Sequence, residues 1–371
     1  MAAFAITVLA LPACQSSATA TPEQSATSAA ATRAADAKIA ALLAEGGPTD
    51  TESGYFESAS PALAAAASGD DDQRFRQLGK LLVQDGFGSA IINLSREMNG
   101  SWYEWSEERA PSSEPDAFIV AWRHVVTAMR SAPGSHFKFL WTVYPKAASV
   151  EEAWPGSAYV DYVGTDMFDW YGGPHSTYPR TSTGALDWTL HWQQDLTSVP
   201  GGLTWIAKFS QATGKPIIIP EYGLDFHTFG GQDDVYFLTH MVAWMKANHA
   251  IGLYWGGNHL SQAGWPGGPL LADQGEAAQK NTVGEVNALG TLLGGHLQYA
   301  GVYLDDQKQI TDATAQEALG PWENSGYQLI LSVDIVPNPP AIKSYSGSTK
   351  RGQYQLADYP DAVAALKHGI G

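Results

Sequence analysis

The sequence of 371 residues contains only one cysteine, Cys14, so no intramolecular disulfide can stabilise it. No apolar run reaches the roughly 18 residues that a membrane-spanning helix needs. The histidines lack metal-ligand spacing such as His-Glu-x-x-His, and neither a Gly-x-Gly-x-x-Gly motif nor a P-loop follows an apolar run. We therefore expect no transmembrane segment, no metal and no cofactor.

Basic side chains are also scarce, with 21 Lys and Arg against 38 Asp and Glu and a formal net charge of −17. This balance argues against a nucleic-acid partner, because binding to phosphates needs clustered Lys and Arg. Aromatic residues are plentiful by contrast, with 13 Trp and 16 Tyr in a chain that is only 16% charged. Flat rings in an uncharged setting suit neutral, ring-shaped ligands such as sugars, although core packing accounts for about half of them.

The first 14 residues form an apolar run that ends in Leu-Pro-Ala-Cys. This pattern resembles a bacterial lipoprotein signal, in which the cysteine is lipidated and becomes the mature N-terminus. No Lys or Arg precedes the run, so a plain secretory signal and a buried strand or helix stay open. We expect a secreted protein, or an outer-membrane or periplasmic lipoprotein with its lipid anchor at Cys14.

Residues 15–69 are rich in Ala, Ser and Thr. A composition of this kind buries too little apolar surface to offset the entropy of ordering, so this segment is expected to be a surface tether. A short helix over 34–43 is possible, but it has little to pack on.

From residue 70 onwards, short apolar runs alternate with amphipathic segments, which is typical of a parallel α/β sheet. The expected strands lie in the runs 90–95, 137–145, 159–171, 215–223 and 250–256. The expected helices lie in 117–130, 203–213 and 234–249, with a further one starting after residue 70. Five such units favour a (β/α)₈ barrel of the TIM type over an open sheet.

Glu97 and Glu221 each directly follow an apolar run. In an α/β barrel, the residues that follow the strands form the mouth, which carries the active site. A pair of carboxyl groups is what glycoside hydrolysis requires, one as general acid and the other as nucleophile or base. Partners in structural ion pairs are the alternative interpretation of these two glutamates.

Four segments, 96–106, 121–127, 158–166 and 214–223, resemble glycoside hydrolase family 26 in order and spacing. The resemblance implies a retaining (β/α)₈ glycosidase with Glu97 as acid/base after strand four and Glu221 as nucleophile at strand seven. The family includes β-mannanases, and other members act on β-glucans, xylans and bacterial exopolysaccharides.

The chain departs from the family pattern at three positions. Arg96 replaces a His that contacts the sugar, and an Arg could hold an anionic sugar or point away from the acid. Phe168 replaces a Tyr that hydrogen-bonds the nucleophile, so we expect Tyr171 or Tyr222 to take its place. Asn93 replaces an Arg that supports the nucleophile.

Polar and aromatic residues at the ends of the expected strands form the predicted substrate site. These are Arg96, Asn99, Trp102, Tyr103, Trp105, Tyr144, Asp166, Trp170, Tyr222 and Trp255. Core packing is the alternative for the aromatic members. The histidines in helical segments, His191 among them, are expected to be structural.

The recognisable barrel, 70–260, holds strands four to eight, so strands one to three need another source. The C-terminal region, 261–371, carries two more apolar runs, 297–304 and 327–337. A permuted order, in which these runs supply strands that normally come first, is our first hypothesis. A rearranged reading frame and a small C-terminal β-rich module are the alternatives.

The sequence therefore predicts an endo-acting retaining glycoside hydrolase of β-linked polysaccharide. Its substrate is mannan-type or, because of Arg96, a bacterial exopolysaccharide. A non-catalytic glycan-binding protein on a degenerate barrel is the alternative from a different functional class.

Overall fold

The computed structural model describes residues 22–45, 60–100, 103–106, 117–145, 150, 153–169, 177–224, 230–254, 282–304, 310–337 and 360–367. The expected lipidation site, Cys14, lies outside them and stays a prediction. Within this part of the chain, no helix has both the length and the apolar character needed to cross a membrane.

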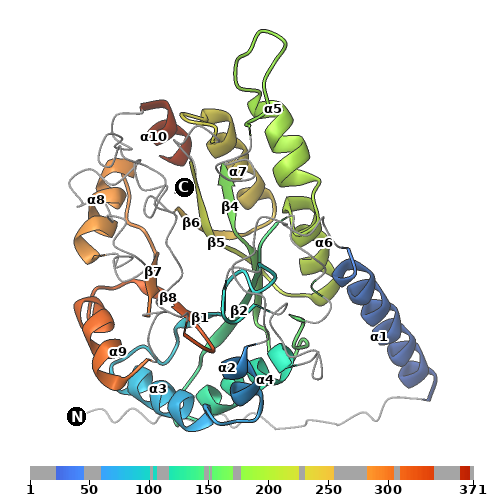
Figure 1. Cartoon of the computed structure of the whole chain (residues 1–371), viewed down its shortest axis with the longest axis vertical. Helices are drawn as coiled ribbons and strands as arrows, with labels where there is room; N and C mark the ends of the chain where they lie inside the picture. Colours follow the sequence, from blue (N-terminus) through green and yellow to red (C-terminus); the bar gives the residue numbers. More distant parts are fainter. Residues whose placement is uncertain are drawn as a thin grey trace, which may run out of the picture.

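A curved parallel sheet forms the centre of the molecule, with helices around its outside (Figure 1). Its strands are β1 (Ile91–Leu94), β2 (Lys138–Val143), β3 (Tyr162–Thr165), β4 (Met167–Asp169), β5 (Ile217–Leu224), β6 (Ile251–Tyr254), β7 (Tyr299–Tyr303) and β8 (Gln328–Val333). A strand that is buried on both faces needs a continuous run of apolar side chains. Every strand that was expected from such a run is present.

The strands lie in the sheet in the order β6, β5, β3, β2, β1, β8 and β7, and the short β4 pairs with β5 beyond the end of β3. The C-terminal strand β8 lies directly beside β1, with Ile91 opposite Ile330 and Leu94 opposite Val333. The two C-terminal apolar runs therefore supply strands of the same sheet. This arrangement is a curled half-barrel that resembles an incomplete (β/α)₈ barrel, and the expected fold class is confirmed.

The two ends of this sheet, β6 and β7, curl towards each other. A Cβ atom built at Gly301 of β7 would lie 3.3 Å from Leu253 of β6. Ile91, Leu140, Ile218 and Ile330 form a separate apolar cluster, which Leu253 also contacts. Since four strands contribute one residue each, this cluster is the inner layer of the barrel.

The helices cover the outside of the sheet. They are α1 (Pro22–Leu43), α2 (Pro61–Ala67), α3 (Asp72–Gln84), α4 (Ala117–Arg130), α5 (Trp188–His191), α6 (Leu203–Thr213), α7 (Val235–Ala247), α8 (Val283–Leu293), α9 (Asp312–Leu319) and α10 (Pro360–Lys367). A π-helical segment, Trp192–Thr197, continues α5. Amphipathic spacing predicted α3, α4, α6 and α7, whereas α5 and α8 were not expected.

The structure differs from the expected tether in two places. α1 is a long helix whose last residues, Leu42 and Leu43, are buried, and the indole of Trp205 on α6 donates a hydrogen bond to the Leu42 carbonyl at 2.8 Å. α2 begins at the cap Ser60, whose hydroxyl accepts from the Leu63 N–H. Alanine-rich sequence therefore packs on the barrel here, because alanine is the best helix former and allows close approach.

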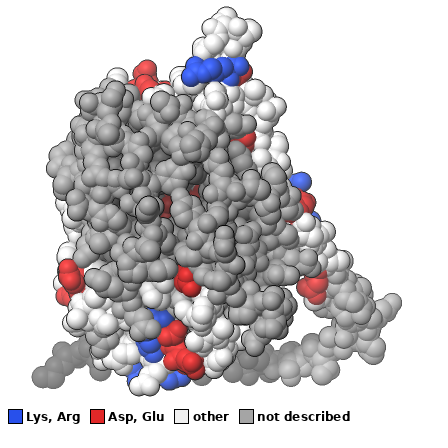
Figure 2. All heavy atoms as spheres, viewed as in Figure 1, with Lys and Arg blue, Asp and Glu red and all other residues white. Residues whose placement is uncertain are grey.

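Charged side chains on the outside are sparse. On the face shown in Figure 2, the described Lys and Arg side chains lie in a few separate groups near the edge, most of them beside Asp or Glu. Arg130 and Lys138, for example, both pair with Asp161.

Candidate active site

Four buried carboxyl groups lie at the carboxyl ends of neighbouring strands. Glu97 follows β1, Asp166 separates β3 from β4, Glu221 lies within β5 and Asp334 follows β8. Each is at most 8% exposed. Burying carboxylates in this number is costly unless they become protonated or pair with a cation.

Glu221 has two partners that stabilise its ionised form. The Tyr303 hydroxyl donates a hydrogen bond of 2.5 Å to Glu221 Oε1, and Arg96 Nε lies 3.9 Å from the same oxygen. Burial, and then the nearby Glu97, nevertheless raise the pKa of Glu221 to about 8, while Arg96 and Tyr303 act against that rise. The charge on Glu221 therefore depends on these two partners.

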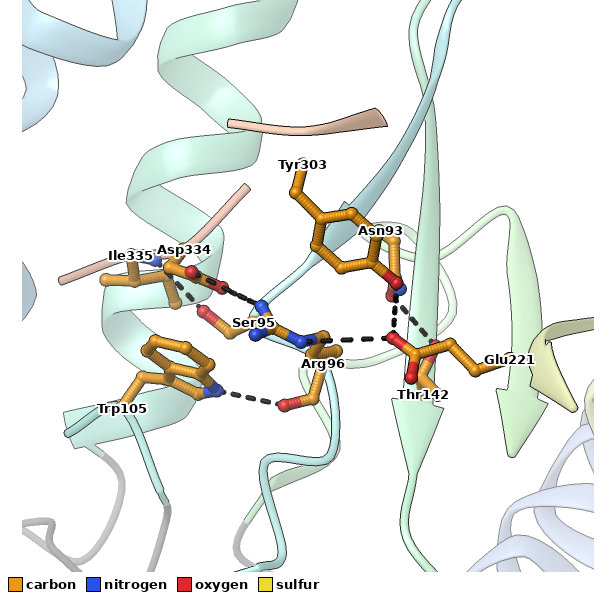
Figure 3. Close-up of polar contacts among 9 residues, drawn as sticks. All are labelled: Asn93, Ser95, Arg96, Trp105, Thr142, Glu221, Tyr303, Asp334 and Ile335. Atoms are coloured by element: carbon orange, nitrogen blue, oxygen red, sulfur yellow. Dashed lines mark hydrogen bonds and ion pairs between the residues drawn. The ribbon is translucent and has the colours of Figure 1, made fainter. Parts of the chain in front are cut away.

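Arg96 lies between Asp334 and Glu221 (Figure 3). Its Nη1 is 3.4 Å from Asp334 Oδ1, and its guanidinium carbon lies 4.9 to 5.3 Å from the ring centres of Tyr103, Trp105 and Tyr303. Aromatic faces attract cations electrostatically. The side chain is thus held from several sides and is only 3% exposed.

The backbone at the end of β1, which carries Arg96 and Glu97, has an unusual conformation. Ser95 and Glu97 both have φ of +48°, a conformation that non-glycine residues adopt rarely and that clusters at active sites. Two contacts hold it there: Trp105 donates its indole N–H to the Arg96 carbonyl at 2.9 Å, and the Ser95 hydroxyl accepts from the Ile335 N–H.

Asp166 is fully buried near Glu97 and Glu221, and within the described residues neither of its oxygens has a hydrogen-bond partner. Burial is the largest cause that raises the pKa of Asp166 well above its usual value, followed by the charges of Glu221 and Glu97. The surroundings of Asp166 therefore favour its protonated form.

The structure brings several of the predicted substrate-site residues together around this centre. Asn99 hydrogen-bonds the backbone N–H and carbonyl of Tyr144, at 2.7 and 2.9 Å, and so ties the loop after β1 to the end of β2. Tyr103 stacks on Trp105 with ring centres 4.2 Å apart. Trp105 itself has no exposed surface, so it supports Arg96 and offers no face to a ligand.

Other predicted residues do not join the centre in the described part of the chain. Trp102, Tyr171, Trp170 and Trp255 lie outside the described residues. Tyr222 is buried in the main hydrophobic cluster, because neighbouring residues of a strand point to opposite faces and Glu221 takes the inner one.

The expectation named Tyr171 or Tyr222 as the phenol at the nucleophile. Tyr171 lies outside the described residues, and the structure adds a phenol that was not expected, that of Tyr303 on β7. Asp334 was not expected at the site either. A signal for both existed, since Tyr303 and Asp334 lie at the carboxyl ends of the apolar runs 297–304 and 327–337.

A second buried polar cluster lies at the end of β4. Tyr178 donates a hydrogen bond of 2.7 Å to Asp169, and His191 Nδ1 lies 3.5 Å from the same oxygen. Asp234 caps α7 through the Phe237 N–H, and burial raises its pKa to about 7. His191 is thus structural, as expected, and among the described residues no group of three or more metal-binding side chains could hold a metal ion.

Residues 84–179 match the model of glycosyl hydrolase family 26. The predicted resemblance to this family is confirmed. The matched segment carries Arg96, Glu97 and Asp166, and the match supports a glycoside hydrolase. No curated protein sequence matches the chain.

Solved structures of family 26 are also similar to the chain. A family 26 β-mannanase from Bacteroides ovatus is 15% identical, with 53% of each chain covered and a TM-score of 0.38. The Bacillus subtilis mannanase BCman is 14% identical, with 50% of this chain and 47% of that chain covered and a TM-score of 0.31. A family 5 xyloglucan-specific endo-β-1,4-glucanase from a metagenomic library is 16% identical, with 55% and 59% covered and a TM-score of 0.35.

The chain therefore spans about half the length of the family 26 structures it matches.

Proposed function

We propose that this protein is a retaining, endo-acting glycoside hydrolase that cleaves a β-linked polysaccharide with Glu97 as acid/base and Glu221 as nucleophile. The observation that supports this most directly is the different environment of the two glutamates. Glu221 has a cation and a phenol at its carboxylate, whereas Glu97 lies near Asp166, a second buried carboxyl group whose pKa is raised by burial. Pairs of titratable groups with contrasting environments are typical of acid and base roles.

In the first step, Glu97 would give its proton to the glycosidic oxygen while Glu221 attacks the anomeric carbon and forms a glycosyl–enzyme ester. In the second step, Glu97 would take a proton from a water molecule while the water oxygen attacks the anomeric carbon of the ester. This attack releases Glu221 as a carboxylate and leaves Glu97 protonated again. Arg96 and Tyr303 would hold Glu221 ionised for the attack. Asp166 is buried near Glu97, and repulsion between the two carboxylates would favour a protonated acid.

We propose that the substrate is a neutral polysaccharide, mannan-type among the candidates. An acidic exopolysaccharide would require a free cation at the reacting sugar. Arg96 does not serve this purpose, because Asp334, Glu221 and three rings surround its guanidinium. Asn99 and Tyr144 line the same end of the sheet, where they would position the sugar together with Asp166.

The proposal is tested by incubating the protein with mannan, β-glucan, xylan and acidic bacterial polysaccharides and by measuring released reducing sugar. We expect cleavage of a neutral polymer, and a fall of at least about 1,000-fold in kcat/KM for Glu221→Gln. Glu323→Gln is the matched control, since Glu323 is exposed in the turn between α9 and β8 and its substitution should leave the rate unchanged.

The acid/base role has its own readout. Cleavage of an activated aryl glycoside by Glu97→Ala should be restored by added azide and give a β-glycosyl azide. The aryl group leaves without protonation, and a small anion can attack the ester without a general base. Equal sugar release by the parent protein and by Glu221→Gln would refute the mechanism. Binding of a polysaccharide without cleavage would instead identify a glycan-binding protein.

A further inference from the structure

Among the described residues, Arg96 is the one cation near the four buried carboxyl groups, and it lies closer to Asp334 than to Glu221. Its contact with Asp334 is 3.4 Å, whereas its contact with Glu221 is 3.9 Å. Asp334 follows β8, and Tyr303, the other partner of Glu221, ends β7. Two strands from the C-terminal segment therefore supply groups that act on a glutamate of β5.

We propose that Asp334 is a positioning residue that competes with Glu221 for Arg96 and thereby sets the pH above which the centre is active. This inference rests on the proposed function, in which Glu221 must be ionised to attack. Asp334 needs no contact with the sugar for this role, because it acts through the guanidinium and through its own charge.

The groups that face Glu221 come from every element packed around it. Glu97 and Arg96 follow β1, Asp166 follows β3, Tyr303 ends β7 and Asp334 follows β8. Arg96 and Tyr303 favour the ionised form of Glu221, while Glu97 and Asp334 favour the protonated form. Asp334 thus opposes Arg96 in two ways: it neutralises part of the cation's charge, and it adds a negative charge of its own.

Removing the charge of Asp334 should favour the ionised form of Glu221. In Asp334→Asn the amide still accepts a hydrogen bond from Arg96, but the competing charge is gone. Glu221 should then ionise at lower pH, so the acid limb of kcat/KM against pH should move down by about one unit. In Arg96→Gln the same limb should move up by about one unit or more. Asp334→Glu keeps the charge, and its limb should stay in place even if kcat falls.

Asp70→Asn is the matched control, because it removes the same charge from an exposed position before α3, where solvent screens it. Its pH profile should coincide with that of the parent protein. Thermal melting of each variant checks that it folds.

A second measurement does not depend on finding a substrate. In protein labelled with ¹³C at the glutamate carboxyl carbon, the signal lost in Glu221→Gln identifies Glu221, and its pH titration reports the charge directly. We expect the titration of this signal to move down in Asp334→Asn. An unmoved titration overturns the inference, whatever the activity. A shifted titration in a protein that cleaves no polysaccharide supports the competition for Arg96 and counts against the proposed function alone.

Discussion

At the scale of single residues, the surroundings of Glu221 come from segments far apart in the chain. Tyr303, more than eighty residues after Glu221, donates a hydrogen bond to it at 2.5 Å. Burial raises the pKa of the Tyr303 hydroxyl further above its usual range, so it stays protonated and acts as a donor to the carboxylate.

Tyr303→Phe should therefore weaken the nucleophile while leaving the fold intact. Loss of the donated hydrogen bond raises the pKa of Glu221 further, so the acid limb of kcat/KM should move to higher pH. We expect kcat/KM at neutral pH to fall by about 10- to 100-fold, since hydrogen bonds to charged groups contribute about 1.5–3 kcal/mol. A pH profile of kcat/KM provides the check, and an unchanged acid limb would contradict the assigned role of Tyr303.

Sequence reasoning found the two glutamates because each follows an apolar run, a position where a charge is costly without a function. It did not find the phenol of Tyr303, because contact across the barrel between β5 and β7 leaves no local trace. For Arg96 it left open pointing away from the acid or binding an anionic sugar, and it did not reveal Asp334, a partner 238 residues further along.

At the scale of elements, the packing of α3 on α4 depends on one small residue. A Cβ atom at Gly79 of α3 would lie 2.9 Å from the Met129 carbonyl oxygen and 3.3 Å from the Ala132 Cβ. Backbone atoms cannot yield as a flexible side chain can. The glycine therefore sets the distance at which the helix that precedes β1 meets the helix that follows it.

Gly79→Ala should destabilise the protein by about 1–3 kcal/mol, although alanine is intrinsically the better helix former by about 1 kcal/mol. Gly320→Ala is the matched control, because Gly320 has helical dihedral angles and nothing lies within 4 Å of the added carbon. That variant should be neutral or slightly more stable. Urea unfolding followed by circular dichroism compares the two, and equal midpoints would contradict the packing argument.

Strands were easier to predict than helices in this chain. All apolar runs became strands, whereas α8 was missed although Val286, Leu289 and Leu293 are buried on one side of it. Glycines at 284 and 290 interrupt its helical pattern, although Thr282 and Glu285 match the Thr-x-x-Glu pattern of a helix start. The long helix α1 was underestimated because its stability comes from contact with α6, which composition does not reveal.

At the scale of the whole molecule, the buried acids make stability depend on pH in an unusual direction. The pKa values of Glu221 and Asp234 rise from 4.5 and 3.8 to about 8 and about 7. An acid with a raised pKa in the folded state binds its proton more tightly there than in the unfolded chain. Its contribution to stability is complete below the unfolded pKa and is lost as pH rises through the folded value.

The free energy of unfolding should therefore fall between pH 5 and pH 8.5, by about 3 kcal/mol when the coupling of the buried acids is considered. Denaturant titrations at several pH values measure this fall. In Glu221→Gln the fall should be clearly smaller, because one of the titrating groups is gone. Stability that is constant or increasing over this range would contradict the protonation states assigned to the centre.

The position of β8 beside β1 also has a consequence for the order in which the protein is made. During synthesis, β1 leaves the ribosome more than 230 residues before the strand that covers its open edge. An uncovered strand edge is a template for pairing with other chains, and domains generally fold as units during translation. The nascent chain must therefore carry an unfinished sheet until nearly all of it has emerged, and its two glutamates appear long before Tyr303 and Asp334 complete their surroundings.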